Sequence, residues 1–198
     1  ATGERKWVSE GWDYNVGNLQ WNGTGEIWFT SPYLGRQPGF RISLADGAVT
    51  KVTEGDYDMG PLQLRNNILV AGIQSMARPT EIAKVDMSNG QFSMITDVNG
   101  HIYENIRMGR SEERYIKTKD GKDLQMWIIY PPDFDPSKKY PALLYCKGGP
   151  QGPLGQSWSY RWNYQMMAAN GYIVVAVNRR GNSGFGSYWR EQISGDYG

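Results

Sequence analysis

The residue types with the clearest chemical potential gather in one glycine-rich loop in the second half of the chain. The loop reads Lys147-Gly148-Gly149-Pro150-Gln151-Gly152-Pro153 and follows the apolar run 141–146. Glycine has no Cβ, so backbone N–H groups next to it can approach a ligand closely. Such N–H groups can face a negative charge, either a phosphate or the oxyanion of an acyl-transfer intermediate.

Two apolar segments frame this loop and predict buried strands. Residues 141–146 (PALLYC) and 172–177 (YIVVAV) are short continuous apolar runs, typical of strands buried on both faces. Between them, residues 162–170 are compatible with a helix that Gly171 would end. This order predicts a βαβ unit with adjacent parallel strands, so residues 147–149 should lie at the C-terminal edge of the first strand.

A hairpin is predicted just before this unit. Residues 114–119 and 124–130 alternate around Asp120-Gly121, and Pro131-Pro132 cannot continue a strand ladder. The change of character near residue 112 divides the chain into a first part, 1–111, and a second part, 112–198.

Several chemistries for the glycine loop can be compared. A dinucleotide-phosphate cradle is disfavoured because the spacing is not Gly-x-Gly-x-x-Gly, Pro150 has no N–H, and Asn178 rather than an acid ends the second strand. A Walker loop is excluded because no Gly-Lys-Ser/Thr follows. Spacing alone leaves two interpretations, the oxyanion loop of an α/β-hydrolase and a glycine-rich turn without chemistry.

The usual nucleophilic machinery is missing from these 198 residues. No serine stands in Gly-x-Ser-x-Gly, and the segment 181–185 departs from that motif at its last position. The single histidine, His101, lies in the repeat region described next, where a catalytic histidine is not expected, and we interpret it as structural or solvated. The single cysteine, Cys146, excludes an intrachain disulfide and a Cys-rich zinc site, and no metal site is predicted.

The first hundred residues contain a repeat with an offset of 43. Residues 13–20 (DYNVGNLQ) align with 56–63 (DYDMGPLQ), and residues 42–47 align with 85–90; a trace of an earlier copy remains at 8–11. Runs such as 27–30 and 68–71 favour strands. Asp46-Gly47 and Asn89-Gly90 predict two-residue hairpin turns, which need positive φ at both positions.

Four strands in about 43 residues is the blade period of a β-propeller. We therefore expect residues 13–53 and 56–96 to form two four-stranded antiparallel blades, with an ordinary sandwich as the alternative. Propellers close with about four to eight blades, so the first part is interpreted as the end of a longer propeller. The expected fold is mixed: propeller blades, then the start of an α/β-hydrolase domain.

Composition excludes other classes of protein. With 39% hydrophobic and 21% charged residues, the chain can bury a core. The net charge of +1 gives no reason to expect nucleic acid or an anionic membrane as partner. No apolar run approaches the roughly 20 residues of a membrane-spanning helix.

The residues around the loop resemble the prolyl oligopeptidase family of serine peptidases. The resemblance is carried by 145–151, 158–163, 178–186 and 189–198, and it covers roughly residues 112–198. Within the family it is similar to dipeptidyl peptidases and acylaminoacyl peptidases. The resemblance implies a propeller capping a hydrolase domain that releases N-terminal dipeptides from short peptides by Ser-His-Asp acyl transfer.

The same resemblance assigns roles to a few residues. Gly148 and Gly149 would form the oxyanion loop, with the N–H of Gly149 as the donor, while the serine, histidine and aspartate would lie outside this chain. Lys147, where relatives place Tyr or His, and Arg180 are candidates for substrate binding; Arg180 is otherwise a loop anchor. Trp158 and Trp162 would line a cavity or pack in the core.

The resemblance also implies the protein's surroundings. It implies no cofactor, the remainder of the same polypeptide as a partner, and a homodimer as one arrangement. Its compartment would be periplasmic or secreted, with a cytoplasmic one as the alternative. A propeller interaction protein with a degenerate hydrolase domain, or an esterase of the same fold, remains an alternative function.

Overall fold

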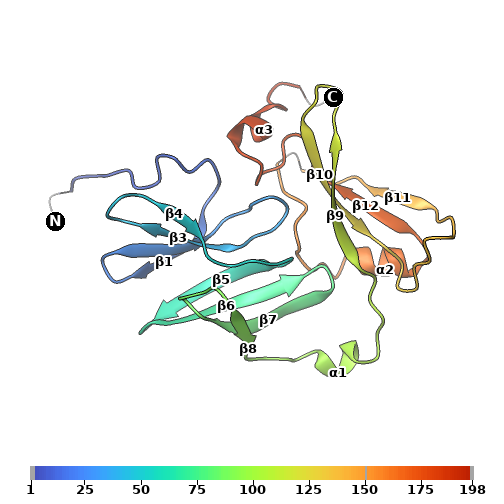
Figure 1. Ribbon diagram of the computed structural model, residues 1–198, viewed down its shortest axis with the longest axis horizontal. Helices are drawn as coiled ribbons and strands as arrows, with labels where there is room; N and C mark the ends of the chain where they lie inside the picture. Colours follow the sequence, from blue (N-terminus) through green and yellow to red (C-terminus); the bar gives the residue numbers. More distant parts are fainter. Residues whose placement is uncertain (1–2, 150, 197–198) are drawn as a thin grey trace.

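The computed structural model describes residues 3–149 and 151–196 and contains three four-stranded sheets (Figure 1). The first consists of β1 (Gly17–Asn22), β2 (Glu26–Thr30), β3 (Gly39–Ser43) and β4 (Val49–Lys51). The second consists of β5 (Asp58–Arg65), β6 (Ile68–Ser75), β7 (Arg78–Val85) and β8 (Phe92–Met94). In both, neighbours in sequence pair antiparallel in the order of the chain, so the two predicted four-stranded antiparallel units are confirmed.

The repeat is also visible in how successive copies touch. A Cβ on Gly47 would lie 3.0 Å from the carbonyl oxygen of Val8, and one on Gly90 would lie 1.9 Å from that of Val52. Gly47 and Gly90 occupy equivalent turns, and Val8 and Val52 belong to the aligned segments of the preceding copies. Each copy therefore places a turn glycine against the backbone of the copy before it, where a side chain has no room.

The predicted two-residue turns at Asp46-Gly47 and Asn89-Gly90 are wrong. Only the glycines have positive φ, +73° and +76°, and the Gly47 N–H donates to the carbonyl of Ser43, which closes a four-residue loop at 44–47. A two-residue turn with positive φ at both positions occurs instead between β5 and β6. There Asn66 and Asn67 have φ of +50° and +59°, as asparagine tolerates better than most residues.

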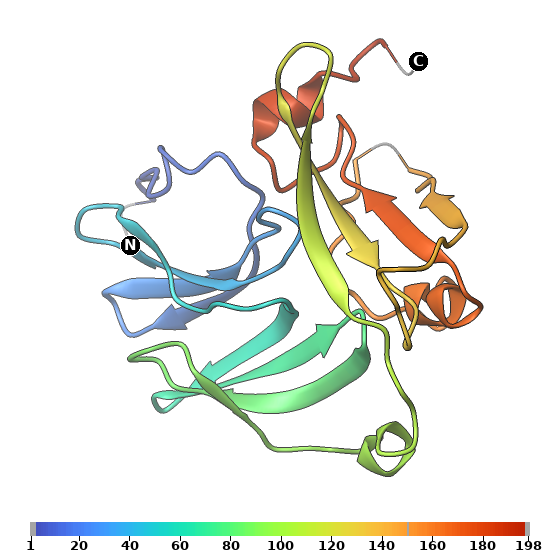
Figure 2. The ribbon, with the colours of Figure 1, turned by 45° about the vertical axis from the view of Figure 1, so that its right-hand side comes forward.

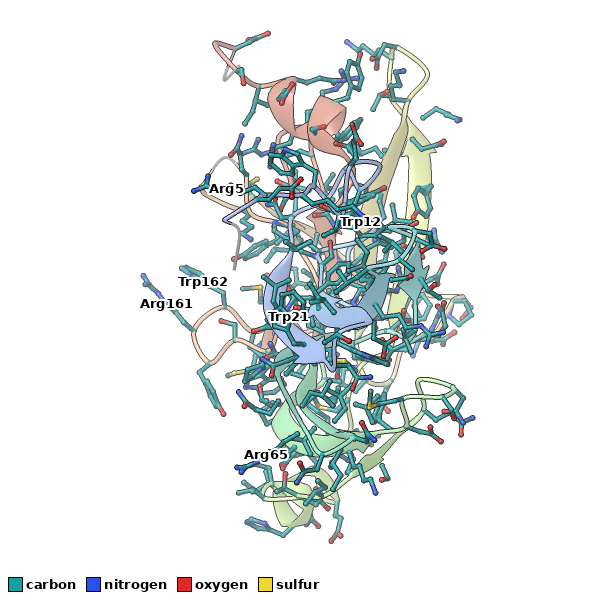
Figure 3. All side chains as sticks on the ribbon, turned by 90° about the vertical axis from the view of Figure 1, so that its left-hand side faces the viewer. Arg5, Trp12, Trp21, Arg65, Arg161 and Trp162 are labelled. Carbon is teal, nitrogen blue, oxygen red and sulfur yellow. The ribbon has the colours of Figure 1, made fainter. Side chains whose placement is uncertain are left out.

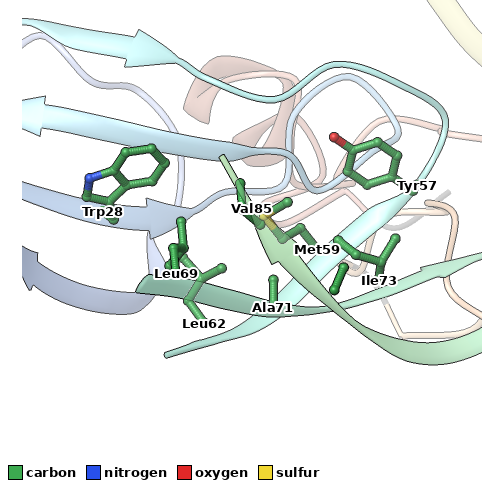
Figure 4. Close-up of a cluster of buried hydrophobic side chains, with 9 residues drawn as sticks. Trp28, Tyr57, Met59, Leu62, Leu69, Ala71, Ile73 and Val85 are labelled. Atoms are coloured by element: carbon green, nitrogen blue, oxygen red, sulfur yellow. The ribbon is translucent and has the colours of Figure 1, made fainter. Parts of the chain in front are cut away.

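The first two sheets share one core. Trp28 of β2 is 1% exposed and packs against the face of the second sheet that carries Met59, Leu62, Leu69, Ala71, Ala83 and Val85 (Figure 4). Alternation along β7, with every second residue buried, turns this face inward. The opposite face of the first sheet is covered by the segment before β1, where Trp12 packs on Phe40 with ring centroids 4.8 Å apart.

The third sheet has the strand order β11-β12-β10-β9. It consists of β9 (Ser111–Lys117), β10 (Asp123–Ile129), β11 (Ala142–Tyr145) and β12 (Ile173–Val177). β9 and β10 form the predicted hairpin, and β11 and β12 pair in parallel as predicted. β12 also pairs antiparallel with β10 and is central, whereas β11 is an edge strand with Leu144 61% exposed, so the predicted burial on both faces is wrong for β11 in this structure.

Three short helices complete the described chain (Figure 2). α1 (Gly100–Tyr103) interrupts the connection from the second sheet to the third, and α3 (Ser187–Glu191) follows β12. α2 (Tyr164–Ala169) lies between β11 and β12, within the predicted 162–170. Asn163 caps it by accepting hydrogen bonds from the N–H groups of Gln165 and Met166, and Gly171 follows it with φ of +87°. None of the described helices is long and apolar enough to cross a membrane.

The third sheet packs directly on the first two. The Trp127 indole N–H donates to the carbonyl of Gly35 at 3.1 Å, and Met76, beside the β6–β7 turn, joins the core under β10 and β12. Arg36, in the β2–β3 connection, pairs with Glu113 of β9 through two hydrogen bonds of 2.8 and 3.0 Å. These contacts fix the second part of the chain against the first.

Candidate functional site

The glycine loop begins where β11 ends, at the carboxyl edge of the parallel pair. A Cβ on either Gly148 or Gly149 would meet nothing within 4 Å, and Gly149 has φ of +74°, a conformation that glycine adopts without strain. Among the described residues, neither N–H donates to another backbone group. Both glycines are exposed; Pro150 lies outside the described residues.

Lys147 is turned toward its own loop. Its Nζ donates to the carbonyl of Pro153 at 2.6 Å, and the bare Cα of Gly152 makes room, since a Cβ there would lie 2.8 Å from Nζ. Burial lowers the pKa of Lys147. The side chain closes the base of the loop in this structure, so its role in substrate binding stays a prediction.

Arg180 lies between the β9–β10 turn and α3. It bonds to the carboxylate of Asp120 and to the amide oxygen of Gln192, and its guanidinium lies 5.3 Å from the ring centroid of Trp189. The hydrogen bond from Arg180 is the main reason why the pKa of Asp120 falls to about 2. These contacts join the β9–β10 turn to α3, which favours the loop-anchor interpretation over substrate binding.

The far end of the glycine loop is tied to the segment after β12. The Ser183 N–H donates to the carbonyl of Gln151 at 3.1 Å. Asn178, fully buried, holds both backbone groups of Leu154 through its side-chain amide. The importance of Asn178 was missed in the sequence, although a polar residue ending an apolar strand was the available signal.

The second sheet contacts residues 155–158, which follow the glycine loop and Leu154. Gly155 packs against the Asp58 carboxylate, with a Cβ position only 3.0 Å from Oδ2. The side chains of Gln74 and Gln156 each accept a backbone N–H across this contact, from Trp158 and Met76 respectively. Burial raises the pKa of Asp58 to about 6, against the opposing effect of N–H groups of Gln156 and Gln37.

The remaining candidates lie apart from the loop. His101 is exposed on α1, and Cys146 is exposed and free. Trp158 packs edge-on against Tyr103 and lines a pocket between α2 and the α1 connection. Trp162 is 51% exposed and projects with Arg161 from the surface (Figure 3), so it does not pack in the core. The described residues contain no group of three His, Cys, Asp or Glu suited to a metal ion.

Comparison with known proteins places this architecture among peptidases. Residues 158–198 match the sequence model of the "Prolyl oligopeptidase family". The chain is 41% identical over its whole length to "Dipeptidyl-peptidase 5" of Porphyromonas gingivalis, of which it spans 29%. It is 43% identical over 80% of its length to the protein of that name from Porphyromonas endodontalis, of which it spans 23%.

Solved structures agree in fold. Acylaminoacyl peptidase of Pyrococcus horikoshii aligns with 98% of this chain at a TM-score of 0.82 and 25% identity, over 30% of its own length. Dipeptidyl peptidase 4 of P. gingivalis aligns with 91% at a TM-score of 0.69 and 25% identity, over 27% of its own length. The three sheets therefore match the fold of part of these peptidase structures. The chain is similar to part of a protein of the prolyl oligopeptidase family.

Proposed function

We propose that this chain supplies part of a serine exopeptidase that removes dipeptides from the free N-terminus of short peptides. In this proposal the first two sheets are consecutive blades of a propeller, and residues 112–198 open an α/β-hydrolase domain. The observation that carries it is the pair of open glycines at the carboxyl end of β11. The names of the relatives at 41% and 43% identity support dipeptide release over other peptidase activities.

The chemistry divides between this chain and the rest of the polypeptide. The Gly149 N–H, with Gly148 giving the backbone room to turn, would donate to the oxyanion that forms when a serine attacks the scissile carbonyl. The serine, and the histidine and aspartate that move and orient its proton, would come from outside these residues. No cofactor is required by this chemistry. A periplasmic or secreted location and a homodimer remain part of the proposal.

The test uses the complete polypeptide that carries this sequence. It should release p-nitroaniline from a dipeptidyl-p-nitroanilide with a free amino group, and much less from the same substrate with that group acetylated. A fluorophosphonate probe should label a serine outside the 198 residues. The 198-residue chain expressed alone should show neither activity nor labelling.

Two alternatives give different results. An esterase of the same fold would hydrolyse p-nitrophenyl esters and leave both anilides intact. A propeller interaction protein with a degenerate hydrolase domain would show no labelling and no turnover. Activity of the isolated chain equal to that of the complete polypeptide would overturn the assignment of the nucleophile to other sequence.

A further inference from the structure

Leu154, at the end of the glycine loop, is held at both of its backbone polar groups by one side chain. Its N–H donates to Asn178 Oδ1 at 2.7 Å, and its carbonyl accepts from Asn178 Nδ2 at 2.8 Å. Asn178 is 0% and Leu154 4% exposed. A buried two-bond contact of this kind fixes the orientation of the peptide as well as its position.

Asn178 is itself fully engaged. Its second Nδ2 hydrogen goes to Gln125 Oε1 at 2.6 Å, and its Oδ1 also accepts from Asn182 Nδ2 at 2.9 Å. Its backbone N–H donates to the carbonyl of Gln125 at 2.9 Å. Two donor hydrogens and two acceptor positions are the full capacity of an asparagine amide, so none is left unsatisfied.

The carboxylate of Glu113 determines which way the side-chain amides of Gln125 and Asn178 are turned. Gln125 Nε2 donates to Glu113 Oε1 at 3.1 Å, and Glu113 is ionised because it pairs with Arg36. A carboxylate only accepts, so Gln125 must turn its nitrogen to Glu113 and its oxygen to Asn178. Asn178 must then present nitrogen to Gln125, which leaves its oxygen for the Leu154 N–H.

We propose that Asn178, oriented by Gln125 and Glu113, is the positioning residue of the glycine loop. The inference rests on the proposed role of Gly149 as oxyanion donor. Gly148 and Gly149 touch nothing within 4 Å of their Cβ positions, so their placement depends on the two ends of the loop. β11 fixes one end, and the Ser183–Gln151 hydrogen bond together with the doubly bonded Leu154 fixes the other. An error of about 1 Å in such a group can cost on the order of a hundredfold in rate.

The decisive variant is Asn178→Asp in the complete polypeptide. It keeps the shape of the side chain but replaces Nδ2 by an oxygen that faces the Leu154 carbonyl and Gln125 Oε1. With a dipeptidyl-p-nitroanilide, kcat should fall by about ten- to a hundredfold, while KM changes by less than about threefold, because the loop contacts the intermediate and not the ground state. Amide hydrogen exchange should become faster at Leu154 and at Ser183, whose N–H groups bond to Asn178 Oδ1 and to the Gln151 carbonyl.

The matched control is Asn105→Asp, which removes a single Nδ2 donation to the His101 carbonyl on the exposed α1 connection. It should leave kcat, KM and loop exchange unchanged. A milder variant, Asn182→Ala, removes only one partner of Asn178 Oδ1 and should give a smaller increase in exchange at Leu154. It keeps the test available if Asn178→Asp does not fold.

The inference is overturned if kcat and loop exchange both stay at their original values in a folded Asn178→Asp protein. It is also overturned if kcat falls only in proportion to the folded fraction while exchange at Leu154 and Ser183 is unchanged. If the unmodified polypeptide has no peptidase activity, the proposed function fails by itself. The exchange comparison still decides whether Asn178 positions the loop.

Discussion

Arg36 is the side chain on which much of the contact between the first and third sheets converges. Besides its two bonds to Glu113, its Nε donates to Asp56 at 2.8 Å, and its guanidinium lies 4.7 Å from the ring centroid of Trp127. Burial alone would raise the pKa of Glu113, but the bonds from Arg36 outweigh it and the pKa is lowered. The pair is therefore ionised and stabilising at neutral pH.

Replacing Glu113→Gln should lower the free energy of unfolding by about 1.5–3 kcal/mol at pH 7, because it leaves a half-buried guanidinium with one fewer charged partner. Since the folded-state pKa of Glu113 is lowered, its contribution is complete above the unfolded pKa near 4.3 and is lost as pH falls through the folded value. The difference between variant and original should therefore shrink on acidification. Urea unfolding of the complete polypeptide at pH 7 and at pH 3.5 measures both effects.

The control for this change is Glu54→Gln, since the Glu54 side chain is 76% exposed and pairs with Lys51 three residues away. Exposed pairs of this kind contribute little, so the unfolding midpoint should hardly move. Equal effects of the two substitutions would contradict a special role for the Arg36 pair.

Among the elements, the strands follow from local sequence and the turns do not. The 43-residue offset reappears in the starts of β4 and β8, Val49 and Phe92. The dipeptides at 46–47 and 89–90 suit more than one turn. The choice is made by side chains such as Asp46, which accepts the Ala48 N–H and favours the longer loop.

The turn glycines give a prediction with an internal control. Gly90 and Gly121 have nearly equal φ, +76° and +78°, but only Gly90 lies against another segment, at the Val52 carbonyl. Gly121→Ala should cost about 1–2 kcal/mol for the left-handed conformation alone. Gly90→Ala should cost about 1–3 kcal/mol more, because Val52 must move. Denaturant midpoints of the two variants compare them directly, and equal costs would refute the close approach between the copies.

On the scale of the whole molecule, the glycine loop is held between two parts of the chain that are distant in sequence. Asn178 holds it from the third sheet, and Asp58 and Gln74 hold the following residues from the second. The βαβ unit and the position of the glycine loop could be predicted, because each strand carries its own pattern. The contacts of the second sheet with residues 155–158 could not be predicted. Trp158 and Gln74, for example, are 84 positions apart and no local pattern links them.

Asp58, which contacts Gly155, makes the stability of the folded chain depend on pH. Because its pKa is raised to about 6, the folded state keeps a proton there that the unfolded state has already lost between about pH 4 and 6. Stability should therefore fall as pH rises through that window and level off above it. Asp58→Asn should remove this decline. The free energy of unfolding of the variant, relative to that of the original protein, should therefore be about 2 kcal/mol higher at pH 7 than at pH 4.5.

Thermal unfolding of the complete polypeptide at the two pH values tests this. The control is Asp123→Asn, at an exposed ion pair with Lys117, which should keep the pH dependence of the original protein. A pH dependence that survives in Asp58→Asn would assign the effect to another group.

The strand order of the third sheet also determines when this sheet can form during synthesis on the ribosome. Each of the first two sheets pairs strands that are neighbours in sequence, so each can form as soon as its own residues have emerged. β10 cannot complete its pairing until β12 has been synthesised, because Met126 pairs with Val177 and β11 and α2 lie between them in sequence. Until then the nascent chain carries an apolar edge at Trp127 and Ile129, open to wrong pairing. This interval of translation is where a nascent-chain chaperone has most to protect.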